Sequence, residues 1–267
     1  MRLISTRHGA SASSISEAIR VGLAGDGGLF IPDEFPEGQL SGLTAQTSLK
    51  ETALALFEPF FKGDALEGVL PELVEETYDF DVPLVNPFPG RPGVFALELF
   101  HGPTGAFKDV GARFLLRCLD RMGDPDNPFT VLAATSGDTG GAVGCAAEGR
   151  TGVRAVILYA KGRISGFQKR QLTCWNAPVS ALEVEGDFDA CQRMVKAAFS
   201  DRDLSNRHNL TSANSINIAR LLPQAAYMAW AARQAYEKNG VKPGLIIPTG
   251  NLGHGVAAIW ARHMGAP

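Results

Sequence analysis

The sequence lacks the features that would direct it to a membrane, to nucleic acid or to an oxidising compartment. None of its apolar runs approaches the ~20 residues that a membrane-spanning helix needs. The net charge is −3 and charged residues make up 20% of the chain, a balance that favours neither nucleic acid nor an anionic membrane as a partner. The four cysteines include no CxxC pair, and the first residues contain no apolar signal-peptide core. We therefore expect a cytoplasmic protein with reduced cysteines, and we leave open whether it is a monomer or a homodimer.

Two nucleotide-binding signatures are absent as well. The loop Pro248–Gly253 has glycines spaced G-x-x-G, but it has no Walker lysine and no full G-x-G-x-x-G. Neither an NTPase site nor a Rossmann dinucleotide site is therefore indicated. The widely separated cysteines also give no reason to expect a metal ion. What the chain has in excess is glycine, with 30 residues that cluster in loops after apolar runs.

After about residue 91 the chain alternates between apolar strands and helices. Strands are predicted at 94–100, 129–134, 153–160, 179–184 and 245–247. Helices are predicted at 110–122, 140–148, 166–172, 188–199, 215–236 and 253–264. This alternation predicts an α/β fold whose parallel sheet is covered by helices on both faces. Such sheets bind ligands beyond the carboxyl ends of their strands.

The first ~90 residues have a different pattern and are predicted to form a mainly helical N-terminal region. Its helices are expected at 14–23, 47–62 and 64–78. Residues 91–267 would form the α/β region, with a smaller mobile subdomain at about 126–205. The last predicted helix should lead into a strand, but Gly265 and Pro267 follow it instead. We therefore expect the last strands of the sheet to be absent from this sequence.

Lys108 is the first candidate for chemistry, in the stretch Glu98–Asp109. It follows a Gly/Pro/Thr turn and precedes a helical pattern, and the acid at Asp109 suits the first turn of a helix. A lysine that loses solvation at such a position can act as an amine nucleophile. The alternative is a surface lysine whose aliphatic stem packs on apolar residues, and for a lysine considered alone that alternative is favoured.

Two loops between a strand and a helix are candidates for binding anions. Thr135–Gly140 offers backbone N–H groups and hydroxyls at a helix N-terminus, which suits a carboxylate. Asp138 within it indicates a partner that carries a proton or a positive charge. The alternative for this loop is a cluster of N-capping residues, which are often Ser, Asp or Thr. In the second loop, Gly250–Gly253, the glycine pair allows a phosphate to approach the backbone closely, although glycines also serve ordinary turns.

A third cluster lies in the segment 212–220. If the helix begins near residue 215, Asn217 and Arg220 are three residues apart and share a face. Arg220 could then hold a phosphate or carboxylate with two hydrogen bonds, and asparagines would add neutral donors. The alternative is a helix cap and a surface arginine. Together, an amine, two anion loops and an Asn/Arg cluster suit a phosphorylated carbonyl cofactor, and pyridoxal 5′-phosphate (PLP) is such a molecule.

With these residues identified, the chain resembles the threonine synthases of many bacteria and fungi. The resemblance extends over nearly the whole chain and is carried by Gly22–Pro32, Glu98–Asp109, Thr135–Gly140, Gly186–Cys191, Ser212–Asn217 and Gly250–Gly253. It implies a tryptophan synthase β-like fold, known as fold type II of the PLP enzymes. It also implies a lyase that converts O-phospho-L-homoserine and water to L-threonine and phosphate by γ-elimination and β-addition of water, the last step of threonine biosynthesis.

The resemblance further implies roles for single residues. Lys108 would form the Schiff base with PLP, and Asp138 would lie near the phenolic oxygen of the cofactor. The substrate would be held by Ser136, Gly137 and Thr139 at its carboxylate and by Asn214 and Arg220 at its phosphate. The PLP phosphate would be held by Gly250, Asn251, Leu252, Gly253 and His254, of which His254 stands where the family usually has asparagine or aspartate. Family members continue well beyond residue 267, so the partner of the pyridine nitrogen is expected outside this sequence.

Two alternatives to a threonine synthase stay open at this point. The first is another fold-type-II PLP lyase that acts on amino acids; an unphosphorylated substrate would leave Asn214 and Arg220 without a task. The second is a catalytically silent domain that binds PLP or phosphate without turnover. The small-molecule substrate and the cofactor would be the partners in the first case, and the cofactor or phosphate in the second.

Overall fold

The computed structural model describes residues 1–213 and 217–267 of the chain. Its helices are α1 (Ile15–Val21), α2 (Leu49–Phe61), α3 (Leu70–Thr77), α4 (Lys108–Met122), α5 (Asp138–Ala147), α6 (Gly166–Thr173), α7 (Phe188–Ser200), α8 (Arg202–Arg207), α9 (Ile218–Asn239), α10 (Gly253–His263) and the 3-10 turn η1 (Glu67–Val69). Its strands are β1 (Leu3–Ser5), β2 (Ser11–Ala12), β3 (Phe30–Pro32), β4 (Leu84–Val85), β5 (Ala96–Leu97), β6 (Phe129–Ala134), β7 (Val153–Ala160), β8 (Val179–Val184) and β9 (Leu210–Thr211).

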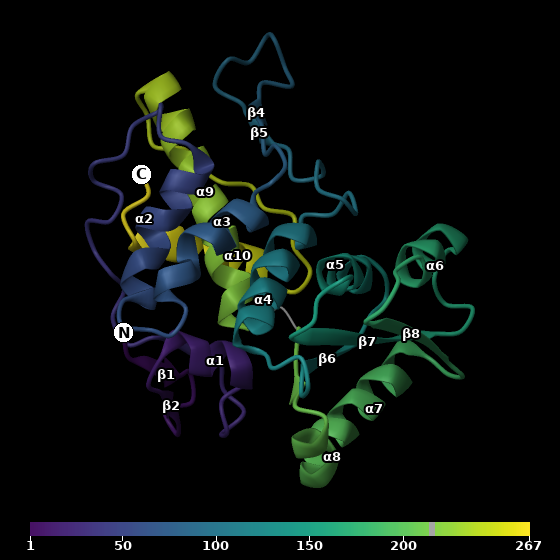
Figure 1. Cartoon of the computed structure of the whole chain (residues 1–267). Coiled ribbons are helices and arrows are strands. Elements are labelled where there is room, and N and C mark those ends of the chain that lie inside the picture. Colours follow the sequence, from purple (N-terminus) through teal and green to yellow (C-terminus); the bar gives the residue numbers. More distant parts are fainter. Residues whose placement is uncertain (214–216) are drawn as a thin grey trace.

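A parallel four-stranded sheet forms the α/β part, as the strand–helix alternation predicts. Its strand order is β8-β7-β6-β9, and β6 pairs with β7 from Phe129 opposite Val153 to Ala134 opposite Leu158. Helices α5 and α6 cover one face of the sheet, and α7 and α8 cover the other (Figure 1). Strand β6 is almost entirely buried, because it has a strand on each side and helices on both faces. The polar loop that follows it is thereby fixed at the carboxyl edge of the sheet.

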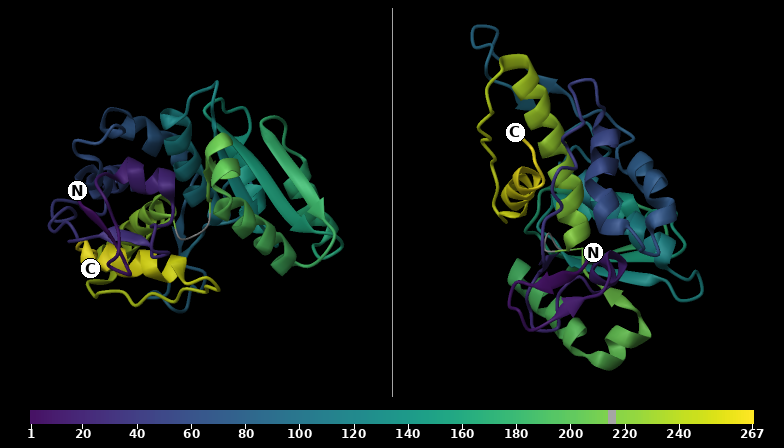
Figure 2. Two further views of the ribbon diagram at one scale, coloured as in Figure 1. Left: turned by 90° about the horizontal axis from the view of Figure 1, so that it is seen from below. Right: turned by 90° about the vertical axis from the view of Figure 1, so that its left-hand side faces the viewer.

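Helix α9 is the centre of the other part of the molecule. It packs against α2, α4 and α10, and Figure 2 shows this helical part beside the parallel sheet. Its many alanines allow neighbouring helices to approach closely, and it continues through Pro223 to Gly240, which ends it in the left-handed conformation. The N-terminal region adds α1, α2, α3 and a small antiparallel sheet of order β2-β1-β3. The mainly helical character predicted for residues 1–90 is therefore confirmed, with this small sheet as an addition.

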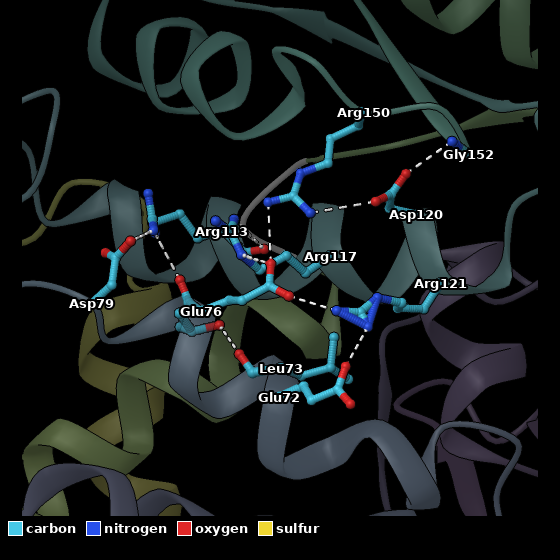
Figure 3. Close-up of polar contacts among 11 residues, drawn as sticks. Glu72, Leu73, Glu76, Asp79, Arg113, Arg117, Asp120, Arg121, Arg150 and Gly152 are labelled. Carbon is cyan, nitrogen blue, oxygen red and sulfur yellow. Dashed lines mark hydrogen bonds and ion pairs between the residues drawn. The ribbon is translucent and has the colours of Figure 1, made fainter.

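A network of charged side chains joins α3 to α4 and to the segment after α5 (Figure 3). The carboxylate of Glu76 on α3 lies 2.9 Å from Arg117 Nε, 2.5 Å from Arg121 Nη2 and 3.1 Å from Arg150 Nη2. Asp120 continues the network, because it contacts Arg150 and accepts a 2.8 Å hydrogen bond from the backbone N–H of Gly152. Three segments that are far apart in the sequence are thus held together by one carboxylate.

Two predicted strands are wrong in whole or in part. The segment 245–247 belongs to no strand, because no described strand pairs with it, and Ile246 is 99% exposed. The predicted strand 94–100 shrinks to β5, which pairs only with β4 in a two-stranded antiparallel sheet. Strand β9 was not predicted; at two residues it is too short to give a periodic signal.

The helix predicted at 64–78 begins later, as the 3-10 turn η1 followed by α3 from Leu70. The other predicted helices and strands agree with the structure to within a few residues, and α4 begins at Lys108 itself. The division of the chain near residue 90 and the mobile subdomain at about 126–205 stay predictions. Among the residues described, the helices include none with the length and apolarity that crossing a membrane requires.

Candidate active site

A cavity of about 490 Å³ lies where the carboxyl edge of the sheet meets α4, α9 and α10. Its volume falls in the range of small-molecule sites. Most of the residues singled out from the sequence line it, namely Lys108, Ser136, Gly137, Asp138, Thr139, Arg220, Gly250, Asn251, Gly253 and His254. Leu252 does not line it, and its side chain is 65% exposed. Asn214 lies outside the described residues. The structure thus brings together residues that are up to 146 positions apart, from 108 to 254.

Lys108 is the first residue of α4 and is partly buried at the cavity wall. Its Nζ lies 4.4 Å from the centre of the Phe107 ring. Burial lowers the pKa of Lys108 below its usual value; the negative charge of Asp138 opposes this shift, and the positive charge of Arg220 adds to it. A larger fraction of the amine is therefore neutral at a given pH than in a solvated lysine, and only the neutral amine is nucleophilic. Lys108 therefore stays the predicted reacting amine.

Asp109 fixes the turn that precedes Lys108. Its buried carboxylate accepts hydrogen bonds from the N–H of Thr104 at 2.9 Å and from the hydroxyl of Thr104 at 2.6 Å. Gly102 leaves room for this arrangement, because a Cβ there would lie 2.6 Å from Asp109 Oδ2. Asp109 also lies in the first turn of helix α4, as expected. Its side-chain hydrogen bonds, however, are with Thr104, in the turn that precedes Lys108.

The loop after β6 is held by its first residue, Thr135. The hydroxyl oxygen of Thr135 accepts hydrogen bonds from the N–H groups of Gly137 and Gly140, each at 3.0 Å. Helix α5 itself begins at Asp138 without a side-chain cap. Thr135 thus binds one N–H of the first turn of α5, as the capping alternative expects for a residue of this loop. The N-cap position is Gly137, which provides no side-chain cap, so the start of α5 also offers backbone to an anion.

The loop before α10 offers a second uncapped helix start. The N-cap position is Leu252, which has a left-handed backbone (φ 55°) and makes no side-chain cap. The side chain of His254 is buried, stacks on Phe107 at 4.5 Å between ring centres and meets the edge of Tyr227 at 5.6 Å. Both ring nitrogens of His254 lack a hydrogen-bond partner within the described protein. Burial, aided by the charge of Lys108, lowers the pKa of His254 to about 4, so the ring is neutral near pH 7.

Arg220 on α9 is a buried cation at the cavity. It is 2% exposed, its Nη1 donates to the carbonyl of Ala213 at 2.5 Å, and its Nε has no partner within the described protein. Burial lowers the pKa of Arg220 to about 10, a value at which the side chain is still charged near pH 7. Gln224, one turn later, has a buried Oε1 that is likewise without a partner. Buried polar groups left unpaired in this way are costly, which indicates that a ligand completes them.

Asn217 does not share this role. Its Oδ1 accepts from the N–H of Ala219 at 3.0 Å, and its Nδ2 donates to the carbonyl of Ile19 at 2.8 Å. The capping alternative is therefore correct for Asn217 and wrong for Arg220, which is buried.

Several lining residues were missed by the sequence analysis. They are Ala134, Gln168, Gln192 and Gln224, while Phe107, Thr135 and Phe188 lie in segments that were named but were given no role of their own. Gln224 could have been found from its i+4 spacing to Arg220, and Phe107 from its position next to Lys108. For Gln168 and Gln192 the sequence gives no signal, because the folding of β7 and β8 is what brings α6 and α7 to the cavity.

Comparisons with known proteins agree with this geometry. Residues 2–78 match the family model described as threonine synthase N terminus, and residues 80–267 match that of pyridoxal-phosphate dependent enzymes. The chain is 38% identical to threonine synthase of Escherichia coli and 36% identical to that of Haemophilus influenzae, in both cases over 100% of this chain and 62% of the relative.

Solved structures give the same result. The PLP-bound threonine synthase of Brucella melitensis superposes with a TM-score of 0.89 at 38% identity, and this chain covers 59% of that one. The yeast threonine synthase gives 0.84 at 35% identity, with 56% of that chain covered. The chain thus spans about 60% of the length of these relatives. The resemblance and the fold expected from the sequence are confirmed, and the chain belongs to the family of pyridoxal-phosphate dependent enzymes.

Proposed function

We propose that this chain carries the active site of a threonine synthase, which converts O-phospho-L-homoserine and water to L-threonine and phosphate. The observation that carries the proposal is the convergence of one partly buried amine, Lys108, with a buried arginine and two uncapped helix starts on one cavity. A substrate with an amino group, a carboxylate and a phosphate needs this set of groups. We place the reaction in the cytoplasm, as the cysteine usage suggests.

The residues present fit PLP. Its aldehyde would be held covalently by Lys108, and its phosphate by the start of α10, where Gly250, Gly253 and the unpaired ring of His254 border the cavity. Asp138 would lie near the phenolic oxygen. When bound, PLP acts as an electron sink that stabilises negative charge on substrate carbons.

The loop at the start of α5 would bind the carboxylate of the substrate. Its backbone N–H groups and the hydroxyls of Ser136 and Thr139 border the cavity beside Lys108. Arg220 would bind the phosphate of the substrate, with Asn214 as its predicted partner. Arg220 is suited to this role because it is charged and buried, and the described residues give its Nε no hydrogen-bond partner.

Lys108 would move the protons of the reaction. Its lowered pKa favours the neutral amine, which can take a proton from a substrate carbon and return one to a neighbouring carbon. The long lysine stem gives the reach that two adjacent carbons require. Partial burial at the cavity wall limits the access of water to the amine.

The test is release of phosphate and formation of threonine from O-phospho-L-homoserine by the chain loaded with PLP. Lys108→Ala should abolish both products, whereas Lys169→Ala, which removes an exposed lysine on α6, should leave them unchanged.

Arg220→Gln should raise KM for this substrate about 10- to 100-fold, as expected for a lost hydrogen bond to a charged group of about 1.5–3 kcal/mol. An unchanged KM in Arg220→Gln would instead favour a lyase acting on unphosphorylated amino acids. Spectral binding of PLP without any product would favour the silent binding domain.

A further inference from the structure

Helix α6 contacts two parts of the site, namely the loop at the start of α5 and the turn that leads into Lys108. A Cβ added to Gly137 in the α5 loop would lie 2.5 Å from Gln168 Nε2, so the side chain of Gln168 lies directly against that loop. Three residues later, Gln171 Nε2 donates a 3.1 Å hydrogen bond to the carbonyl oxygen of Thr104. Thr104 belongs to the turn that leads into Lys108. One short helix therefore joins the two halves of the site.

Helix α6 is held rigidly on α5. The facing side of α5 consists of glycines, and a Cβ at Gly140 or Gly144 would lie 2.5 Å from Leu172 or 2.3 Å from Trp175. The indole N–H of Trp175 also donates to the carbonyl of Gln171 at 2.7 Å, which fixes the last turn of α6. Because the two helices are in such close contact, α6 cannot shift along α5 without a clash. The hydrogen bond from Gln171 to Thr104 thus fixes the position of the turn before Lys108 relative to α5.

Thr104 is held from two sides. Asp109 on α4 binds its N–H and its hydroxyl, and Gln171 binds its carbonyl. The turn ends at Phe107, whose ring contacts both the amine of Lys108 and the ring of His254. If the contact with Gln171 is lost, the turn stays attached to α4 but no longer to the sheet part of the molecule.

We propose that Gln171 is a positioning residue for Lys108, which acts through the carbonyl of Thr104 and sets the lysine turn relative to the anion loop of α5. This inference rests on the proposed function, because it takes Lys108 as the reacting amine. Gln171 does not border the cavity, so its effect on Lys108 is indirect.

The test compares Gln171→Met, which keeps the length of the side chain but removes its donor, with Arg170→Gln at the exposed neighbouring position of α6. The first measurement is hydrogen exchange of the amides of Thr104 and Gly105 in the full chain. Gln171→Met should speed it about five- to tenfold, which at 1.4 kcal/mol per tenfold corresponds to the loss of about one hydrogen bond. Exchange in the middle of α4 should not change, which excludes general destabilisation.

The second measurement is the pH profile of Lys108 acetylation by acetic anhydride, followed by mass spectrometry without cofactor. A looser turn exposes the amine, so the midpoint should rise towards that of a solvated lysine in Gln171→Met and stay in place in Arg170→Gln. Equal exchange in both variants, or an unchanged midpoint in Gln171→Met, would overturn the inference. The proposed function fails differently, by the absence of threonine formation in the parent chain, and neither measurement here depends on turnover.

Discussion

Glu76 allows a stringent test of how the fold is held together. Its carboxylate contacts three arginines that come from α4 and from the segment after α5. Replacing it by glutamine keeps the size of the side chain and removes the charge. The side chain of Arg117 is only 8% exposed and would then lie buried next to other arginines. Its pKa, lowered to about 10 chiefly by burial and then by Arg113 and Arg150, shows that the positive charge already lies in an unfavourable place.

The expected loss lies between two limits. Exposed ion pairs contribute about 0–1 kcal/mol, and removing one partner of a fully buried pair costs about 3–5 kcal/mol. Glu76 is 30% exposed and two of its three partners are about as exposed, so we expect Glu76→Gln to lower the free energy of unfolding by about 2–3 kcal/mol. For a chain of this size that corresponds to a fall in Tm of roughly 5–10 °C.

Urea unfolding followed by tryptophan fluorescence measures this loss at pH 7. The matched control is Glu72→Gln, which removes a 63% exposed carboxylate with a single partner, Arg121, and should cost less than about 0.5 kcal/mol. If the two variants lose the same stability, the network contributes no more than surface charges and the reasoning is wrong.

The pH dependence of stability provides a second test of the role of Glu76. Burial alone would raise the pKa of Glu76, but the hydrogen bond from Arg121 and the charges of Arg150 and Arg117 hold it below its ordinary value of 4.5. A lowered pKa in the folded state means that the stabilisation is present above pH 4.5 and is lost as the pH falls through the folded value. The stability difference between the parent chain and Glu76→Gln should therefore narrow in acid.

Two further predictions concern the site. Gly111→Ala should lower the free energy of unfolding by about 1–3 kcal/mol through overpacking and should weaken substrate binding, because its Cβ would lie 2.8 Å from Arg220 Nε. The control is Gly68→Ala, where a Cβ has no neighbour within 4 Å. Equal stability of the two variants in urea would contradict this packing. Asp138→Asn should lower the pKa of Lys108 further, because the carboxylate of Asp138 opposes the effect of burial. The pH profile of Lys108 acetylation measures this pKa, and an unchanged midpoint would show that Asp138 does not act on the amine.

The sequence predicted well those elements whose signal is local. Strands β6, β7 and β8 are short segments rich in apolar and β-branched residues, and their limits agree with the prediction. Leu245, Ile246 and Ile247 give the same signal, yet they form no strand, because a strand exists only when a neighbour pairs with it. The pattern of a single segment does not contain that information.

The sequence indicates a role for a site residue when that role follows from the chemistry of its side chain. It does not indicate the role when this depends on which groups the folded chain places next to the residue. Lys108 and Arg220 became candidates because an amine and a guanidinium occur together with two anion loops and with the segments that resemble a known family; each considered alone was as compatible with a surface residue. The role of Asn217 stayed open between a ligand and a helix cap, because whether its amide binds a ligand or the carbonyl of Ile19 depends on how α1 packs against α9. Thr135 was given no role of its own for the same reason, since its two backbone partners are determined by the fold of the loop.

The central claim is that Lys108 is the amine that binds PLP. The most direct measurement is reduction of the PLP-loaded chain with borohydride, followed by peptide mapping in a mass spectrometer. The account predicts that the reduced cofactor is found on Lys108 and that Lys108→Ala carries none. Labelling of Lys161 or Lys169 instead, or of no lysine in a chain that shows the visible band of the bound cofactor, would contradict it.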